Sequence, residues 1–213
     1  MEPPEVSEME RMPEKLFNLE DADKCILLDR FGKPVSLGDA RSGHTCIIVF
    51  LRHFLDYITK EYVEDFSKIF PRYLKERNVK ILLISCAPSR FIQPFSDETN
   101  CPHEMLCDSK RIIHNTLGLH NTLQPSLNGA NSPHIKSNAF TGFFTNVWRA
   151  VKSTVEQGDP FQQGGQVIID PDGKILFFHR ESHPHDHTPI NELLKVIGME
   201  RIDFKTKYKI HNV

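Results

Sequence analysis

Hydrophobic and polar positions switch along the chain between strand-like and helix-like patterns. Two continuous apolar runs rich in β-branched residues, 45–51 and 79–85, are typical of strands buried on both faces of a sheet. Between them, apolar residues from Tyr62 to Leu74 recur at steps of three and four, which predicts an amphipathic helix. Because proline disrupts a helix interior, we expect this helix to end or kink near Phe70, just before Pro71.

Weaker segments continue the same alternation. The sequence predicts short strands at 25–28, 35–37 and 104–107, a helix at 88–98, and a helix capped by Ser109 that ends near Gly118.

The clearest hairpin lies near the C-terminus. Two apolar runs, 166–170 and 174–178, flank a Pro-Asp-Gly turn, and a helix at 189–197 follows with Gly198 just past its end. The order of elements predicts an α/β fold with a mixed central sheet flanked by helices.

Two segments do not fit this alternation. Residues 1–15 hold five Glu and three Pro without an apolar period, so we expect a flexible acidic tail before a single domain at 16–213. Residues 121–157 predict a helical insertion, beginning as a loop and continuing as an apolar stripe at helical spacing around Trp148. That stripe indicates a helix packed on the core; a lid or a dimer face is the alternative.

Composition narrows the class of protein. The chain has 213 residues, 39% hydrophobic, with 26 basic against 28 acidic side chains. The near balance argues against a nucleic-acid partner, and no apolar run approaches the ~18 residues that span a membrane. Five cysteines without C-x-x-C spacing and a start unlike a secretory signal predict a cytoplasmic protein with free thiols and no cofactor. We expect a monomer or homodimer with a protein partner that the sequence does not name.

The loop that follows the first buried strand, residues 52–59, is where an α/β sheet of this kind usually places its chemistry. A cysteine there would lie at a helix start, whose partial positive charge favours the reactive thiolate.

The same region carries a family resemblance. The segment from Phe50 to Asp65, with Arg52-His53-Phe54-Leu55, Tyr57 and Lys60-Glu61-Tyr62, is similar to the peroxiredoxin-like AhpC/TSA antioxidant-domain proteins of the thioredoxin superfamily. Further matching segments are Ser132–Asn138, Trp148–Val151, Gly158–Pro160, Gln162–Gly165, Phe178–Arg180, Asp186-His187 and Pro189–Asn191. The resemblance spans residues 20 to 213 and implies a thioredoxin-like fold and an ancestry in thiol redox chemistry.

The chain departs from this family at the loop itself. The family pattern places a C-x-x-C pair where this sequence has Asp56 and Thr59. A carboxylate and a hydroxyl form neither a sulfenic acid nor a disulfide, so thiol oxidation cannot start at this loop. Asp56 is a favoured N-cap, and the first interpretation is that it caps a helix. The second is that it mimics a permanently reduced, anionic site that a partner recognises. Arg52 and His53 flank it, and we expect structural hydrogen bonds and an ion pair with Asp56.

Another thiol could have taken over. Cys86 follows the second buried strand at the same sheet edge, before a possible helix start, so it is the candidate for a relocated reactive cysteine; a buried, inert side chain is the alternative. Cys46 lies inside a predicted strand and should be buried, whereas Cys101 is expected in an exposed loop.

A histidine-rich segment offers a third kind of chemistry. His183, His185 and His187 would point to one side of an extended strand and could bind zinc or copper, although Pro184 makes a loop with incidental histidines the simpler interpretation.

Three hypotheses result. The chain is a redox-inactive pseudoenzyme that acts by binding or regulation in redox or metabolic signalling; or it is an antioxidant thiol peroxidase or oxidoreductase that uses Cys86; or it binds a metal through His183, His185 and His187.

Overall fold

A computed structural model describes residues 18–54, 56–119, 133–134 and 162–204. Within them the strands form one seven-stranded mixed sheet in the order β2-β1-β5-β4-β3-β6-β7. The strands are β1 (Ile26–Leu28), β2 (Pro34–Ser36), β3 (Thr45–Leu51), β4 (Val79–Ser85), β5 (Glu104–Cys107), β6 (Gly165–Ile169) and β7 (Ile175–Arg180). β3, β4 and β5 run parallel to one another, while the β6–β7 hairpin and the β1–β2 pair are antiparallel.

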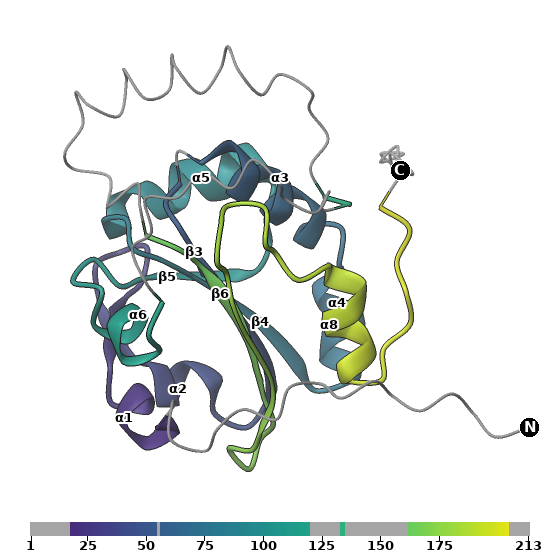
Figure 1. Cartoon of the computed structure of the whole chain (residues 1–213), viewed down its shortest axis with the longest axis horizontal. Helices are drawn as coiled ribbons and strands as arrows, with labels where there is room; N and C mark the ends of the chain where they lie inside the picture. The colour runs from purple at the N-terminus through teal and green to yellow at the C-terminus, as the bar shows by residue number, and fades with distance from the viewer. Residues whose placement is uncertain (1–17, 55, 120–132, 135–161, 205–213) are drawn as a thin grey trace, which may run out of the picture.

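Helices cover both faces of this sheet (Figure 1). In chain order they are α1 (Leu19–Asp23), α2 (Leu37–Arg41), α3 (Tyr57–Phe66), α4 (Pro71–Glu76), the 3-10 turn η1 (Ser89–Phe91), α5 (Ile92–Thr99), α6 (Ile112–Thr116) and α8 (Ile190–Val196). One face is packed by α3, α4, α5 and α8, and the other by α1, α2 and α6. The predicted α/β architecture is confirmed.

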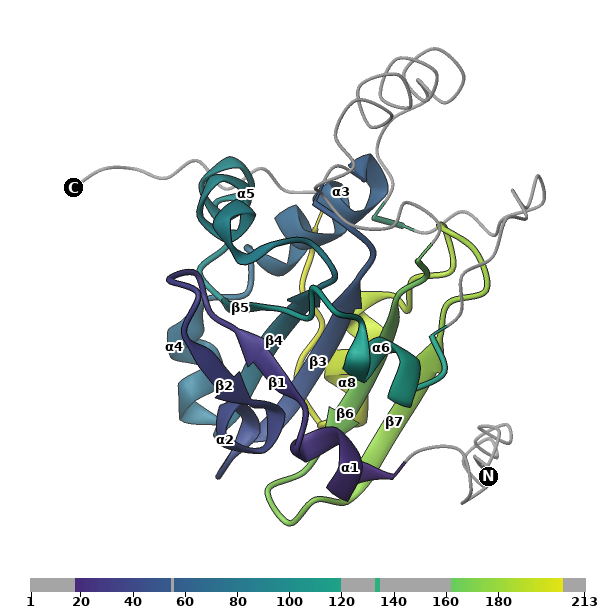
Figure 2. The same ribbon diagram turned by 90° about the vertical axis from the view of Figure 1, so that its left-hand side faces the viewer.

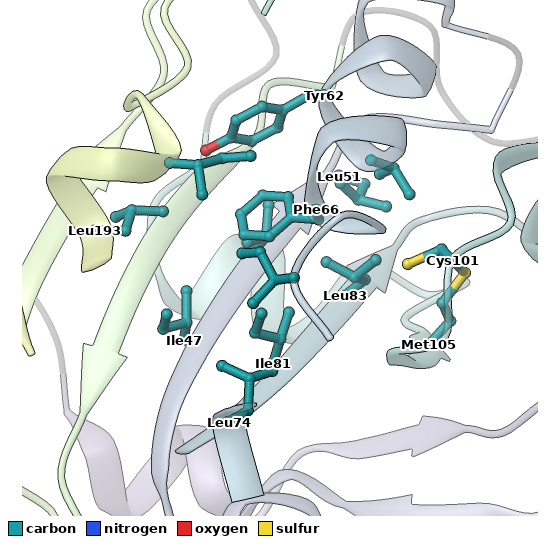
Figure 3. Close-up of a cluster of buried hydrophobic side chains, with 14 of the residues drawn as sticks. Ile47, Leu51, Tyr62, Phe66, Leu74, Ile81, Leu83, Cys101, Met105 and Leu193 are labelled. Atoms are coloured by element: carbon teal, nitrogen blue, oxygen red, sulfur yellow. The ribbon is translucent and has the colours of Figure 1, made fainter. Parts of the chain in front are cut away.

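The central strand β3 shows why the sheet is buried on both sides. Alternate side chains of a strand point to opposite faces. Ile47 and Val49 accordingly lie in the cluster under α3 and α8, and Ile48 and Phe50 in the cluster under α1, α2 and α6. Figure 3 shows the first cluster, where Tyr62 and Phe66 of α3 lie over the sheet between β3 and α8. The bounds predicted for β3, β4 and β5 are confirmed.

Several helix boundaries differ from the sequence prediction. The helix expected from Tyr62 begins five residues earlier, at Tyr57, and ends at Phe66. Pro71 does not end it but begins α4, where the missing N–H of proline costs no hydrogen bond.

One capping assignment and one strand boundary also differ. Ser109 does not cap α6: its hydroxyl donates to the Ala87 carbonyl, and the Asp108 carboxylate accepts the Ile112 N–H at 2.8 Å instead. At β2 the strand stops at Ser36, whose hydroxyl accepts from Asp39 N and starts α2.

The predicted acidic tail at 1–15 and nearly all of the predicted insertion at 121–157, including the Trp148 stripe, lie outside the described residues. In the part that the structure describes, no helix is long and apolar enough to cross a bilayer.

Candidate functional site: the strand-end rim at Asp56

The site, called the rim below, consists of Arg52, Asp56, Thr59 and Cys86 at the carboxyl ends of β3 and β4. Figure 2 shows these two strands side by side in the middle of the sheet. The last residues of the two parallel strands, Leu51 and Ser85, stand opposite each other. Arg52 and Cys86 directly follow these two residues, so they lie next to each other at this edge of the sheet. The Cys86 thiol donates to the Arg52 carbonyl oxygen at 2.6 Å. The prediction that Cys86 shares an edge with the Asp56 loop is confirmed.

Asp56 is the N-cap of α3. Its Oδ2 accepts a hydrogen bond from the backbone N–H of Thr59 at 3.3 Å and another from the Thr59 hydroxyl at 2.7 Å. A short polar side chain just before a helix satisfies one of the N–H groups that the first turn leaves open. Both side chains are buried, so Asp56 and Thr59 form one hydrogen-bonded unit at the helix start. The capping interpretation is confirmed.

Arg52 fixes this unit to the sheet. Its Nη1 lies 3.3 Å from Asp56 Oδ2, and its Nε donates to the carbonyl oxygen of Gln162 at 3.1 Å. Arg52 is only 7% exposed. A cation buried to this degree requires an anionic or carbonyl partner, because burial removes its hydration. The predicted ion pair between Arg52 and Asp56 is confirmed.

The surroundings keep Asp56 ionised. Burial alone would raise the pKa of this carboxyl group, but the charges of Arg52 and His53, the Thr59 hydroxyl and the charge of His187 together hold the pKa below its ordinary value. Asp56 therefore stays ionised near neutral pH, and the Arg52 guanidinium beside it balances its charge.

A second polar group faces the rim from the loop after β7. His187 Nδ1 lies 2.7 Å from Glu181 Oε1, and Gln166 Nε2 donates to the same oxygen at 2.5 Å. The His187 ring stacks on Tyr62 with centroids 4.5 Å apart and an angle of 3° between the planes. Among the described residues, His187 Nε2 and Glu181 Oε2 are buried and have no hydrogen-bond partner. Sequence reasoning missed Glu181, because nothing in its spacing links it to Gln166 or Tyr62.

The histidine segment does not form the metal site considered from the sequence. His183 and His185 lie in an irregular loop with ring centroids 6.2 Å apart, while His187 pairs with Glu181. Burial lowers the pKa of His185, and neighbouring His183 lowers it further. Across residues 18–54, 56–119, 133–134 and 162–204, no three His, Cys, Asp or Glu side chains are placed to hold a metal ion.

All five cysteines of the chain are described; none forms a disulfide, and all five are buried. Cys86 is 2% exposed, and Cys46 is inside β3 as predicted. The prediction of an exposed Cys101 is wrong: its side chain packs beside Met105 between α5 and β5 and is 5% exposed (Figure 3). Burial raises the pKa of Cys46 and of Cys101 to about 11, which disfavours the reactive thiolate.

A further buried pair joins distant segments of the chain near the C-terminal end of α3. His134 Nδ1 lies 2.8 Å from Asp65 Oδ2 of α3, and His134 Nε2 accepts the backbone N–H of Ile190 at 3.1 Å. Asp65 also pairs with Lys68 at 2.8 Å. His134 was part of the family-like segment 132–138, but its partners are 69 and 56 residues away and had no sequence signal.

This architecture is that of a thioredoxin-like protein: parallel β3, β4 and β5, an antiparallel β6–β7 hairpin, and a helix that starts at the central strand's carboxyl end. Residues 65–183 match the family model described as AhpC/TSA antioxidant enzyme. The chain is 39% identical over 189 residues to "Peroxiredoxin-like 2C" of Bos taurus, covering 88% of this chain and 82% of that protein. The human protein of the same name is also 39% identical, with 88% and 83% covered. The chain belongs to the AhpC/TSA antioxidant family, as a peroxiredoxin-like protein.

Solved structures agree on the fold. The bacterioferritin comigratory protein of Xanthomonas campestris, whose structure is described in terms of alkyl peroxide reduction, superimposes with a TM-score of 0.56 at 15% identity. The match covers 85% of this chain and 94% of that one. At this identity the likeness shows the thioredoxin-like fold and leaves the chemistry of this chain to its own residues.

Proposed function

We propose that this chain is a peroxiredoxin-like protein that performs no thiol chemistry at the rim and acts instead by binding a protein partner in redox or metabolic signalling. The observation that carries the proposal is the replacement of the reacting atom. A buried carboxylate, Asp56, occupies the helix start where this fold would activate a thiol, and none of the five cysteines is exposed.

Peroxide reduction by a protein thiol needs a thiolate that the peroxide can reach. Asp56 cannot be oxidised in this way, and Thr59 donates its hydroxyl hydrogen to Asp56. The rim keeps the ordered helix start of a thiol enzyme without its nucleophile. Because Asp56, Thr59 and Arg52 are buried, the rim provides a rigid polar frame beneath the surface that a partner would contact.

Peroxide consumption by the purified full chain, with a thiol reductant present, tests this proposal. We expect no consumption above the rate of the reductant alone. The matched positive control is the double variant Asp56→Cys with Thr59→Cys, in which an intact scaffold should create a thiol of lowered pKa. Peroxide turnover by the wild-type chain would overturn the proposal. Proteins retained by the wild-type chain should also be the same under reducing and oxidising conditions; a redox-dependent set would contradict it.

One observation favours a second function, a thiol oxidoreductase that uses Cys86. The Cys86 thiol lies at the rim and donates a hydrogen bond to the carbonyl oxygen of Arg52, whose guanidinium pairs with Asp56. The variant Cys86→Ser separates the two functions. If the wild-type chain turns over peroxide and Cys86→Ser does not, the second function is correct and the first is wrong.

A further inference from the structure

A cleft lies between the β1–β2 turn and α5, which Figure 2 shows close to each other. Its volume is about 490 Å³, a size at which small-molecule sites are found. Three stretches of the chain form its walls: residues 29–31 of the turn, Ile92, Gln93 and Ser96, and residues 101–105. None of the rim residues lines it.

The β1–β2 turn presents an aromatic ring and a cation to this cleft. Asp29 Oδ1 accepts the backbone N–H groups of Phe31 and Lys33, each at 2.8 Å, which fixes the shape of the turn. The Phe31 side chain is 82% exposed. The Arg30 guanidinium lies 5.3 Å from the centre of the Phe31 ring, and its Nη1 donates to Gln93 Oε1 of α5 at 3.3 Å. These contacts hold the ring and the cation in place beside α5.

His103 lines the same cleft and brings a hydrogen-bond acceptor to it. Its Nε2 lies 2.9 Å from the carbonyl oxygen of Phe66, and a carbonyl oxygen only accepts, so Nε2 carries the hydrogen. Burial lowers the pKa of His103, which favours the neutral ring with an acceptor at Nδ1. His103 is only 8% exposed, yet nothing among the described residues donates to Nδ1. Water or a ligand in the cleft has to supply that donor.

The charges around the cleft leave its cation available. Asp29 and Glu104 are the acidic residues that line it, and both already have partners. Asp29 accepts the two backbone N–H groups of the turn, and Glu104 Oε2 lies 2.7 Å from Lys80 Nζ. Arg30 has no carboxylate partner in the described part of the chain. An anionic group that enters the cleft therefore finds a guanidinium that is free to pair with it.

We propose that this cleft binds a small anion that carries a flat ring with an N–H donor. The anionic group pairs with Arg30, the ring stacks on Phe31, and the N–H donates to His103 Nδ1. Nucleoside monophosphates and indole carboxylates share this chemistry. The site is independent of the proposed function, because no rim residue takes part and peroxide turnover does not report on it.

Calorimetric titration of the full chain with adenosine monophosphate and, separately, with indoleacetate tests the proposal. We expect at least one of the two to bind with a Kd below about 1 mM. Binding of only one of them supports the proposal and identifies the anion, phosphate or carboxylate. The halves of each probe, adenosine and inorganic phosphate or indole and acetate, should bind at least about tenfold more weakly than the whole. Failure of both probes to bind, or a half that binds as tightly as its whole probe, would overturn the proposal.

Two substitutions of exposed residues locate the ligand without disturbing the core. Arg30→Gln should weaken binding about tenfold through the loss of a charge-assisted hydrogen bond, and Phe31→Ser about fivefold through the loss of stacking. The matched controls are Arg72→Gln and Phe70→Ser at the start of α4, both exposed and outside the cleft, which should bind as the wild type does.

The nitrogen NMR signal of His103 Nδ1, measured in isotope-labelled full chain, reads out the third contact. It should shift as the probe saturates the cleft, because Nδ1 then gains a donor. An affinity unchanged in either Arg30→Gln or Phe31→Ser would place the ligand elsewhere and overturn the proposal. A Nδ1 signal that stays unmoved at saturation would overturn it as well.

Discussion

Replacing Asp56 by Ala should destabilise the fold through two effects that the structure separates. The variant removes the cap on Thr59, worth about 1 kcal/mol. It also leaves Arg52 buried without its carboxylate partner; breaking a buried pair from one side typically costs 3–5 kcal/mol. Arg52 keeps the Gln162 carbonyl, so we take the lower end of that range and, together with the cap, expect a total loss of about 4 kcal/mol.

Thermal unfolding of Asp56→Ala measures this loss. For a chain of this size, a loss of 1 kcal/mol lowers the unfolding midpoint by about 2–4 °C, so the midpoint should fall by about 8–16 °C. A double-mutant cycle with Arg52→Met then isolates the pair, since residues in contact couple by about 0.5–3 kcal/mol. The matched control is Asp39→Ala, an exposed acidic residue of α2 outside the rim.

The pH dependence of the same variant adds an independent check. The pKa of Asp56 is depressed in the folded chain, against the opposing effect of burial, by Arg52 and His53. A depressed carboxyl pKa contributes stability above the unfolded value, near 3.8, that is lost as the pH falls through the folded value. The difference between wild type and Asp56→Ala should be constant from about pH 5 to 8 and shrink below about pH 4. A variant within about 0.5 kcal/mol of wild type at pH 7 would refute the reasoning.

Three other substitutions probe the frame around the rim. Gly164→Ala should lower the free energy of unfolding, measured by chemical denaturation, by about 1–3 kcal/mol, because a Cβ there would collide with a backbone carbonyl oxygen of β3. Stability equal to that of the wild type would show that the backbone can move to make room for the methyl group. Asp186→Asn should lower the pKa of His179 in an NMR titration, because the Asp186 carboxylate accepts a hydrogen bond from the His179 ring and so raises its pKa. The stability that this pair provides is present below pH 6.5 and lost as the pH rises through the folded pKa. An unmoved pKa would contradict the pairing. His134→Ala should cost about 2 kcal/mol or more, because it leaves buried polar partners without a hydrogen bond, while the partly exposed control His44→Ala should change stability little. Equal effects would exclude a special role for the buried imidazole.

The strands could be predicted from the sequence because their signal is local. The bounds of β3 and β4 coincide with their runs of β-branched and apolar residues, which alone suffice to mark a strand buried on both faces. The start of α3 could not be placed this way. Its first turn, from Tyr57, is fixed by the Asp56 cap and by Arg52, and neither contributes to the apolar period.

The candidate site was predicted in part for the same reason. Asp56, Arg52 and Cys86 follow directly from strand ends, so the topology of a parallel sheet brings them together. The pairing of Glu181 with His187 and the burial of Cys101 depend on how irregular loops pack. The exposure of Cys101 was predicted wrongly because the sequence of a loop does not show which helix packs against it; here that helix is α5.

The loop between β7 and α8 has no regular secondary structure, yet it is held at several points. The Tyr62 hydroxyl donates to the Thr188 carbonyl oxygen, and Gln166 Oε1 accepts from the Thr188 hydroxyl. Glu181 Oε1 lies within hydrogen-bond distance of His187 Nδ1. These bonds fix the backbone of the loop before any encounter with another molecule. A protein docking on it would spend little conformational entropy on ordering, so its residence time would depend on the contacts it makes there.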